Sequence, residues 1–168
     1  MSHVLVAYAT KHGSTEAIAT AIAERLNACG VPATSVEASR VPSLEPYDAV
    51  VLGSAVYARR WRAEARHFMR RHASELARKP FWVFSSGPVG DPANDNPAWE
   101  EPAHTIANAL ELGARDHAVF GGALPVEPHG MMMRSMARNT PAEFRDRRDW
   151  DEIRTWTDAI ADALRVPA

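Results

Sequence analysis

The sequence predicts an α/β fold in which helices cover both faces of a parallel sheet. Two observations support this: short apolar runs typical of doubly buried strands alternate with one-faced amphipathic stretches, and no internal repeat, low-complexity tract or linker interrupts them. Repeated strand–helix alternation implies right-handed crossovers, which build such a sheet. At 168 residues, the chain is long enough for one domain over 1–168 and short for two.

The first half of the chain contains three expected strands and two expected helices. Residues 4–8 and 48–53 are apolar runs typical of buried strands, and 33–36 is a weaker one. Residues 15–28 place apolar side chains four apart, and Gly30 follows where a helix end belongs. We predict one helix over 61–76, with Ala65, Phe68, Met69, His72 and Leu76 on or near one face.

The second half continues the alternation. Strands are expected at 80–85 and 117–124, and helices at 105–112 and 150–164. Two long stretches, 87–102 and 125–148, each follow a strand, so both emerge at the carboxyl edge of the sheet. Open α/β sheets bind ligands at that edge, and long loops in compact domains are often functional.

Composition is that of an ordinary globular protein. Hydrophobic residues make up 46% of the chain, charged residues 24%, and the net charge is −2, so no bulk attraction to nucleic acid is expected. The lone Cys29 permits no internal disulfide, and no basic or long apolar leader precedes the first strand. These features predict a cytoplasmic protein, and peripheral contact with the inner face of the membrane stays open as an alternative. Metal binding is not expected, because His67 and His72 are five apart and there is no cysteine cluster.

The sharpest chemical signal lies between the first strand and the first helix. Residues 10–15 read Thr-Lys-His-Gly-Ser-Thr, which combines hydroxyl donors, a glycine and a helix N-terminus, as a phosphate dianion requires. The motifs of nucleoside triphosphate and dinucleotide loops are absent. The alternative is that Ser14 or Thr15 simply caps the helix.

Three segments resemble the flavodoxin superfamily. Residues 10–15 resemble its T-x-T-G-x-T phosphate loop, with His12 where the family more often has Thr. Residues 51–57 and 85–90 resemble the loops that follow its third and fourth strands. The resemblance implies a flavodoxin-like three-layer sandwich, with a five-stranded parallel sheet in the order 2-1-3-4-5 and FMN at the switch between the first and third strands.

The resemblance also implies the residues that meet FMN. No catalytic side chain is expected, because the flavin ring carries the chemistry. Tyr57 and Trp61 are candidates to stack on the ring, with Trp61 alternatively a core residue. The expected cofactor-binding residues are Thr10, Lys11, His12, Gly13, Ser14, Thr15, Ser54, Ala55, Val56, Tyr57, Ser86, Gly87, Pro88 and Gly90. The expected substrate or partner rim consists of Arg59, Arg60, Trp61 and Arg62.

Within the superfamily, the chain most resembles the menaquinone-dependent protoporphyrinogen oxidases. The shared features are Phe-x-x-x-His at 68–72, Gly-Ala-Leu at 122–124, a Met- and Arg-bearing insert and a Trp-containing last helix. It departs from them at 57–59, where Tyr-Ala-Arg replaces an Arg and a Tyr-Gly pair. It also departs after the fourth strand, where acidic, Pro-rich sequence replaces a basic run.

Charge and resemblance together predict function. Residues 59–79 hold eight basic and two acidic residues, so they would attract an anionic substrate or anionic lipid headgroups, or else form a solvated helix face. We expect an FMN-dependent oxidoreductase that passes reducing equivalents from an organic donor, such as a tetrapyrrole, to a quinone or other acceptor. The alternatives are a flavodoxin-type single-electron carrier with a redox-protein partner, and a flavin-free binding domain.

The methionine-rich segment 129–138 has two interpretations. We favour a short helix that tucks its methionines under the sheet edge. The other interpretation is an interface with lipid, quinone or a partner, because clustered Met beside Arg makes an adaptable apolar surface.

Overall fold

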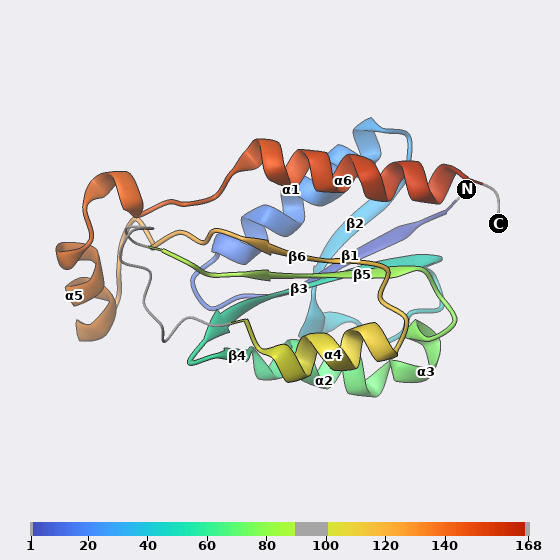
Figure 1. The fold of residues 1–168 in the computed structure, drawn as a ribbon, viewed down its shortest axis with the longest axis horizontal. Coiled ribbons are helices and arrows are strands. Elements are labelled where there is room, and N and C mark those ends of the chain that lie inside the picture. The colour runs from blue at the N-terminus through green and yellow to red at the C-terminus, as the bar shows by residue number, and fades with distance from the viewer. Residues whose placement is uncertain (1, 90–100, 167–168) are drawn as a thin grey trace.

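A central sheet of five parallel strands organises the computed structural model, which describes residues 2–89 and 101–166 (Figure 1). Its order is β2-β1-β3-β5-β6, the order that the resemblance implied. A short strand, β4, pairs antiparallel with the end of β3. The bounds are β1 Val4–Ala9, β2 Ala33–Glu37, β3 Ala49–Tyr57, β4 Arg60–Trp61, β5 Phe81–Ser86 and β6 His117–Phe120.

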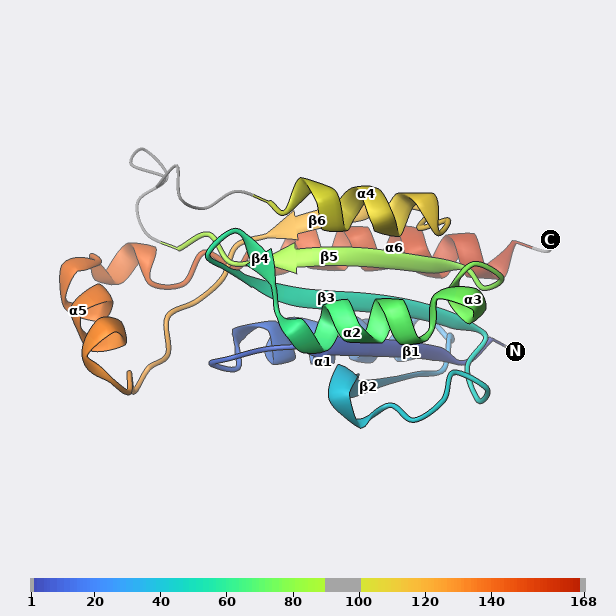
Figure 2. The ribbon, with the colours of Figure 1, turned by 90° about the horizontal axis from the view of Figure 1, so that it is seen from below.

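Helices form a layer on each face of this sheet, so the three-layer prediction is confirmed (Figures 1 and 2). One layer consists of α1 (Ser14–Ala28) and α6 (Trp150–Arg165). The opposite layer consists of α2 (Ala63–Arg71), α3 (Ala73–Leu76) and α4 (Ala103–Glu111). In the described part of the chain, no helix is long and apolar enough to cross a membrane.

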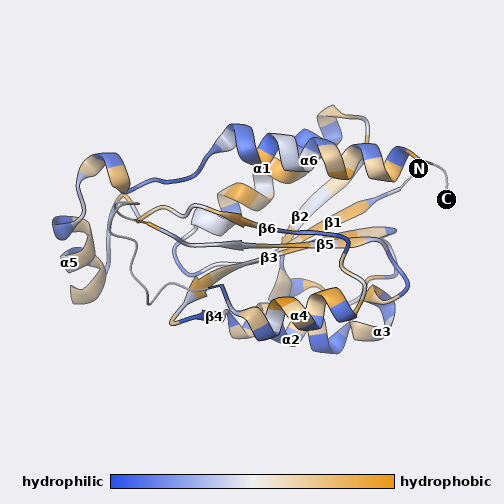
Figure 3. Ribbon diagram, viewed as in Figure 1, coloured by the Kyte–Doolittle hydropathy of each residue, from blue (hydrophilic) through white to orange (hydrophobic). Residues whose placement is uncertain are grey.

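Alternating residues of the strands build two cores. Leu5 of β1 belongs to the cluster that contains Phe68 of α2. Its neighbour Val6 belongs to the cluster that contains Ile18 of α1. This is the two-sided burial that the apolar runs predict. Apolar and polar bands alternate along α2 and α4 in Figure 3, as expected of helices with one buried face.

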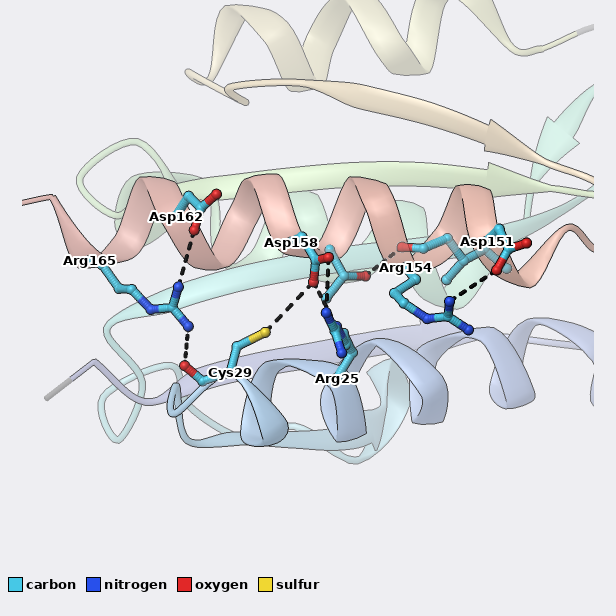
Figure 4. A network of polar contacts seen from close by, with 9 residues as sticks. Arg25, Cys29, Asp151, Arg154, Asp158, Asp162 and Arg165 are labelled. Atoms are coloured by element: carbon cyan, nitrogen blue, oxygen red, sulfur yellow. Dashed lines mark hydrogen bonds and ion pairs between the residues drawn. The ribbon is translucent and has the colours of Figure 1, made fainter.

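Polar contacts join the two helices of the first layer (Figure 4). Arg25 of α1 donates to Asp158 of α6 through Nε at 2.6 Å and Nη2 at 3.0 Å. Arg165 donates to the carbonyl of Cys29 and, at 3.1 Å, to Asp162. The guanidinium of Arg25 lowers the pKa of Asp158. These contacts hold the last helix against the first.

The segment after β3 differs from the expected loop and helix. β3 continues to Tyr57, and the predicted helix over 61–76 is instead β4, α2 and α3, with a break at His72. Val56 pairs with Trp61 across a two-residue turn whose residues, 58 and 59, have φ of 49° and 61°. Because Trp61 must reach the core, the chain doubles back as a hairpin before the helix starts.

The segment after β6 also differs from expectation. β6 ends at Phe120 instead of residue 124. The next residue, Gly121, packs against the backbone of Arg147, where a Cβ would lie 2.0 Å from the carbonyl oxygen. The insert contains a helix, α5 (Met131–Asn139), and a short 3-10 helix, η3 (Ala142–Phe144). α5 has no buried residue, so the expectation that its methionines tuck under the sheet edge is wrong.

Candidate functional site

Three segments meet at the carboxyl edge of the sheet, as the sequence predicts. The loop 10–15 follows β1, the β3–β4 hairpin adjoins it, and the end of β5 closes the other side. The His12 ring lies edge-on to Tyr57 with centroids 6.0 Å apart. The hydroxyls of Thr15 and Ser86 are hydrogen-bonded at 2.8 Å. These two contacts link the loop to both of its neighbours.

The loop 10–15 leaves the start of α1 without a side-chain cap. Gly13 is the N-cap residue, at φ 92°, and no side chain accepts a bond there, so the alternative of a Ser14 or Thr15 cap is not observed. The Thr10 hydroxyl accepts the amide of Gly13 at 2.9 Å and shapes the turn. A Cβ on Gly13 would meet nothing within 4 Å, so this glycine serves backbone conformation. The first-turn amides therefore keep donors that an anion can use.

Tyr57 stands beside this loop at the end of β3. It is 38% exposed, and the ammonium of Lys11 lies 5.5 Å from its ring centre. Burial raises the pKa of Tyr57, against an opposing effect of Arg62, so its hydroxyl is neutral at physiological pH. The left-handed turn at 58–59, which costs about 1–2 kcal/mol per residue, fixes the place of this side chain. Its ring offers a flat apolar face at the edge of the site.

The charges around His12 are positive. Burial lowers the pKa of His12, and Lys11, Arg62 and His129 lower it further, with no acidic residue opposing them. Arg62 reaches this region from the start of α2. In the described residues, its buried Nε has no hydrogen-bond partner. The site thus combines a neutral imidazole, cations and an unused donor.

These donors fit a flavin mononucleotide. Its phosphate would need donors at the start of α1, and the first-turn amides there and the hydroxyls of residues 10, 14 and 15 have that chemistry. Its ring would need a flat apolar partner, and Tyr57 at the edge of the site has that chemistry.

Buried polar side chains brace the hairpin. Ser54 Oγ accepts the amide of Arg62 at 2.9 Å and donates to the carbonyl of Ala55 at 2.9 Å. Ala55 and Val56 are buried as well. The side chains of these three expected binding residues therefore support the fold, and their backbones pair with the neighbouring strands.

Trp61 does not lie on the rim, and that part of the prediction is wrong. Its side chain is 1% exposed, and Nε1 donates to Ser85 Oγ at 2.8 Å. The large indole ring can be buried at little cost because its N–H is hydrogen-bonded. The other rim residues fare differently: Arg59 and Arg60 are exposed, and Arg62 is partly buried.

The loop after β5 is held by the segment after β6. The amide of Gly87 donates to Phe120 at 3.2 Å, and the amide of Gly122 donates to Pro88 at 2.9 Å. A Cβ on Gly122 would lie 3.0 Å from Gly87, so the two backbones pack closely. Gly90 lies outside the described residues.

Two residues of the site escaped the sequence analysis. His129 belongs to the insert and lowers the pKa of His12, although the two residues are more than a hundred positions apart in the sequence. No local sequence pattern indicates this interaction. The Ser85 hydroxyl accepts a hydrogen bond from the indole N–H of Trp61 and donates one to the Glu101 carboxylate at 3.4 Å. Its one signal is a hydroxyl near the end of a buried strand.

Comparisons with known proteins agree with this geometry. A family model described as "Flavodoxin domain" matches residues 5–148. Protoporphyrinogen IX dehydrogenase (quinone) of Escherichia coli K12 is 24% identical over 175 residues, which cover 97% of each chain. A flavodoxin from the domain Archaea superposes with a TM-score of 0.67 at 16% identity, covering 98% of this chain and 99% of that one. Two-electron reduced Megasphaera elsdenii flavodoxin superposes with a TM-score of 0.64 at 18% identity, covering 95% of this chain and 98% of that one.

Proposed function

The chain belongs to the flavodoxin domain family of flavoproteins, and from that premise we propose that it is an FMN-dependent oxidoreductase acting on an anionic organic donor. The donor class we propose is a carboxylated tetrapyrrole, and the acceptor a quinone. The full-length likeness to a protoporphyrinogen IX dehydrogenase supports this choice.

The observation that carries the proposal is the positive charge around the site. The cations that act on His12 are Lys11 and Arg62, and Arg62 also pairs with Glu64 at 3.4 Å. Such a field favours a phosphate in the loop and carboxylates on an incoming substrate.

Each part of the site has a task in this proposal. The hydroxyls of Thr10, Ser14 and Thr15, with the first-turn amides of α1, would hold the phosphate. Tyr57 would lie against the ring, and Arg62 would attract the substrate carboxylates. When bound, FMN would supply the redox centre, and the protein would supply position and electrostatics.

Turnover tests this proposal directly. Protein loaded with FMN should oxidise protoporphyrinogen IX with menadione as acceptor, and protein without FMN should not. Arg62→Gln should raise KM while FMN stays bound, and Arg78→Gln, which removes an exposed charge on the far end of the α2–α3 region, should change nothing. Absence of turnover in loaded protein would contradict the proposal.

A second candidate is a single-electron carrier between redox proteins. The likeness of the fold to solved flavodoxins favours it. In that case, loaded protein would exchange electrons with a redox protein and show no turnover of protoporphyrinogen with menadione.

A further inference from the structure

The helix α5 projects beyond the carboxyl edge of the sheet (Figures 1 and 2). None of its residues is buried. Met131 and Met132 are 85% and 78% exposed, and Val126 just before the helix is 99% exposed. We refer to residues 126–138 as the insert tip. Three exposed apolar side chains close together on one protruding element indicate a surface that is covered in use.

The same element is rich in arginine. A groove of about 820 Å³ between α5 and the segment 142–148 is lined by four arginines and one acid, namely Arg134, Arg138, Arg145, Arg148 and Asp146. Asp146 already accepts two bonds from the guanidinium of Arg148, at 2.7 and 3.0 Å, and one from its amide at 3.0 Å. Within 2–89 and 101–166, no carboxylate pairs with Arg134 or Arg138. The uncompensated charge of the groove is therefore positive.

Charge decides among the covers that the apolar tip could have. A second copy of this chain in a symmetric contact would bring the same arginines toward each other, which is unfavourable. An anionic lipid headgroup complements the arginines, and the interface beneath it accepts methionine and valine side chains. A membrane surface thus satisfies both the apolar and the cationic parts of the tip.

We propose that the insert tip docks reversibly on membranes that contain anionic lipid. Met131, Met132 and Val126 enter the interface, and Arg134 and Arg138 meet the lipid phosphates. Docking turns the carboxyl edge of the sheet, with the loop 10–15, toward the bilayer. The inference does not depend on the proposed oxidoreductase activity, because membrane binding is measured without turnover.

Vesicle co-sedimentation of the full chain tests the proposal. Vesicles of phosphatidylcholine alone should bind weakly, and vesicles of phosphatidylcholine with phosphatidylglycerol should bind well. Arg134→Gln combined with Arg138→Gln should lower the partition coefficient about thirtyfold. Met131→Ser combined with Met132→Ser should lower it at least about tenfold.

Matched controls keep the result specific. Arg70→Gln with Arg78→Gln removes two exposed charges elsewhere, and Leu110→Ser removes an apolar side chain that is 46% exposed on α4. Neither control should change the partition coefficient, and thermal melts should show that all variants fold. Equal binding to both vesicle types, binding to neither, or loss only in the control variants would overturn the proposal. A dimer that the methionine variant dissociates would overturn it in favour of a second copy.

Discussion

Replacing Thr15 by Val separates a structural from a ligand-binding role of one hydroxyl. Thr15 and Ser86 are both 0% exposed, and their hydroxyls are bonded at 2.8 Å. Val keeps nearly the same shape but leaves the buried Ser86 hydroxyl unpaired, which should lower the free energy of unfolding by about 1–3 kcal/mol. If this hydroxyl also serves the phosphate, FMN affinity should fall by a further 1.5–3 kcal/mol, or about 10- to 150-fold.

A second buried threonine provides the control. Thr157 of α6 is also 0% exposed, and its hydroxyl donates to the carbonyl of Ile153 at 2.7 Å, in the middle of that helix. Thr157→Val should lower stability and leave FMN affinity unchanged. Urea unfolding gives the first quantity and titration of FMN fluorescence gives the second. An equal effect of both variants on FMN affinity would refute the role of Thr15 in the phosphate loop.

Three further substitutions test the structure itself. Trp61→Phe should lower the free energy of unfolding by about 1–3 kcal/mol, because it removes a buried hydrogen bond, and it should leave FMN affinity intact. A large loss of FMN affinity at unchanged stability would indicate instead that Trp61 contacts the flavin ring. Asp158→Asn should remove a pH-dependent part of the free energy of unfolding. Because Arg25 lowers the pKa of Asp158, the ion pair stabilises the fold at pH values above the ordinary pKa of 3.8. This contribution is lost as the pH falls through the lowered pKa of the folded state. Urea unfolding of both proteins at neutral and acid pH checks this, and parallel curves would contradict it. Gly53→Ala should destabilise by at least about 1–3 kcal/mol, because its Cβ would lie 2.0 Å from the buried ring of Phe84; a wild-type melting temperature would refute that packing.

The sequence predicts the sheet and its helical layers because doubly buried strands leave plain apolar runs. The five parallel strands and their main helices lie where those runs and stripes indicate, within a few residues at the ends. The hairpin at 57–60 is not predicted from the sequence, because a two-residue strand has no periodicity. In addition, the apolar helical stripe of 65–76 extends back across Trp61, which favours one continuous helix. Hydropathy favours burial for Met131 and Met132, and it cannot tell a buried methionine from one on an exposed insert.

The candidate site is partly predictable for a similar reason. Loop 10–15 can be found because its hydroxyls and glycine lie together at a strand–helix junction. The bond between Thr15 and Ser86 joins residues 71 apart, so no sequence pattern shows it. The lowering of the pKa of His12 by His129 also joins residues that are more than a hundred positions apart in the chain. Such contacts follow from the tertiary arrangement of segments whose own sequences carry no sign of it.

Comparison of FMN with riboflavin tests most directly whether the loop 10–15 receives a phosphate. The two ligands share the ring and differ in the phosphate, so titration of cofactor-free protein with each isolates that group. Two or more charge-assisted bonds from this loop should make FMN at least about a hundredfold tighter than riboflavin. Equal affinity for the two ligands, or no binding of FMN, would contradict the account.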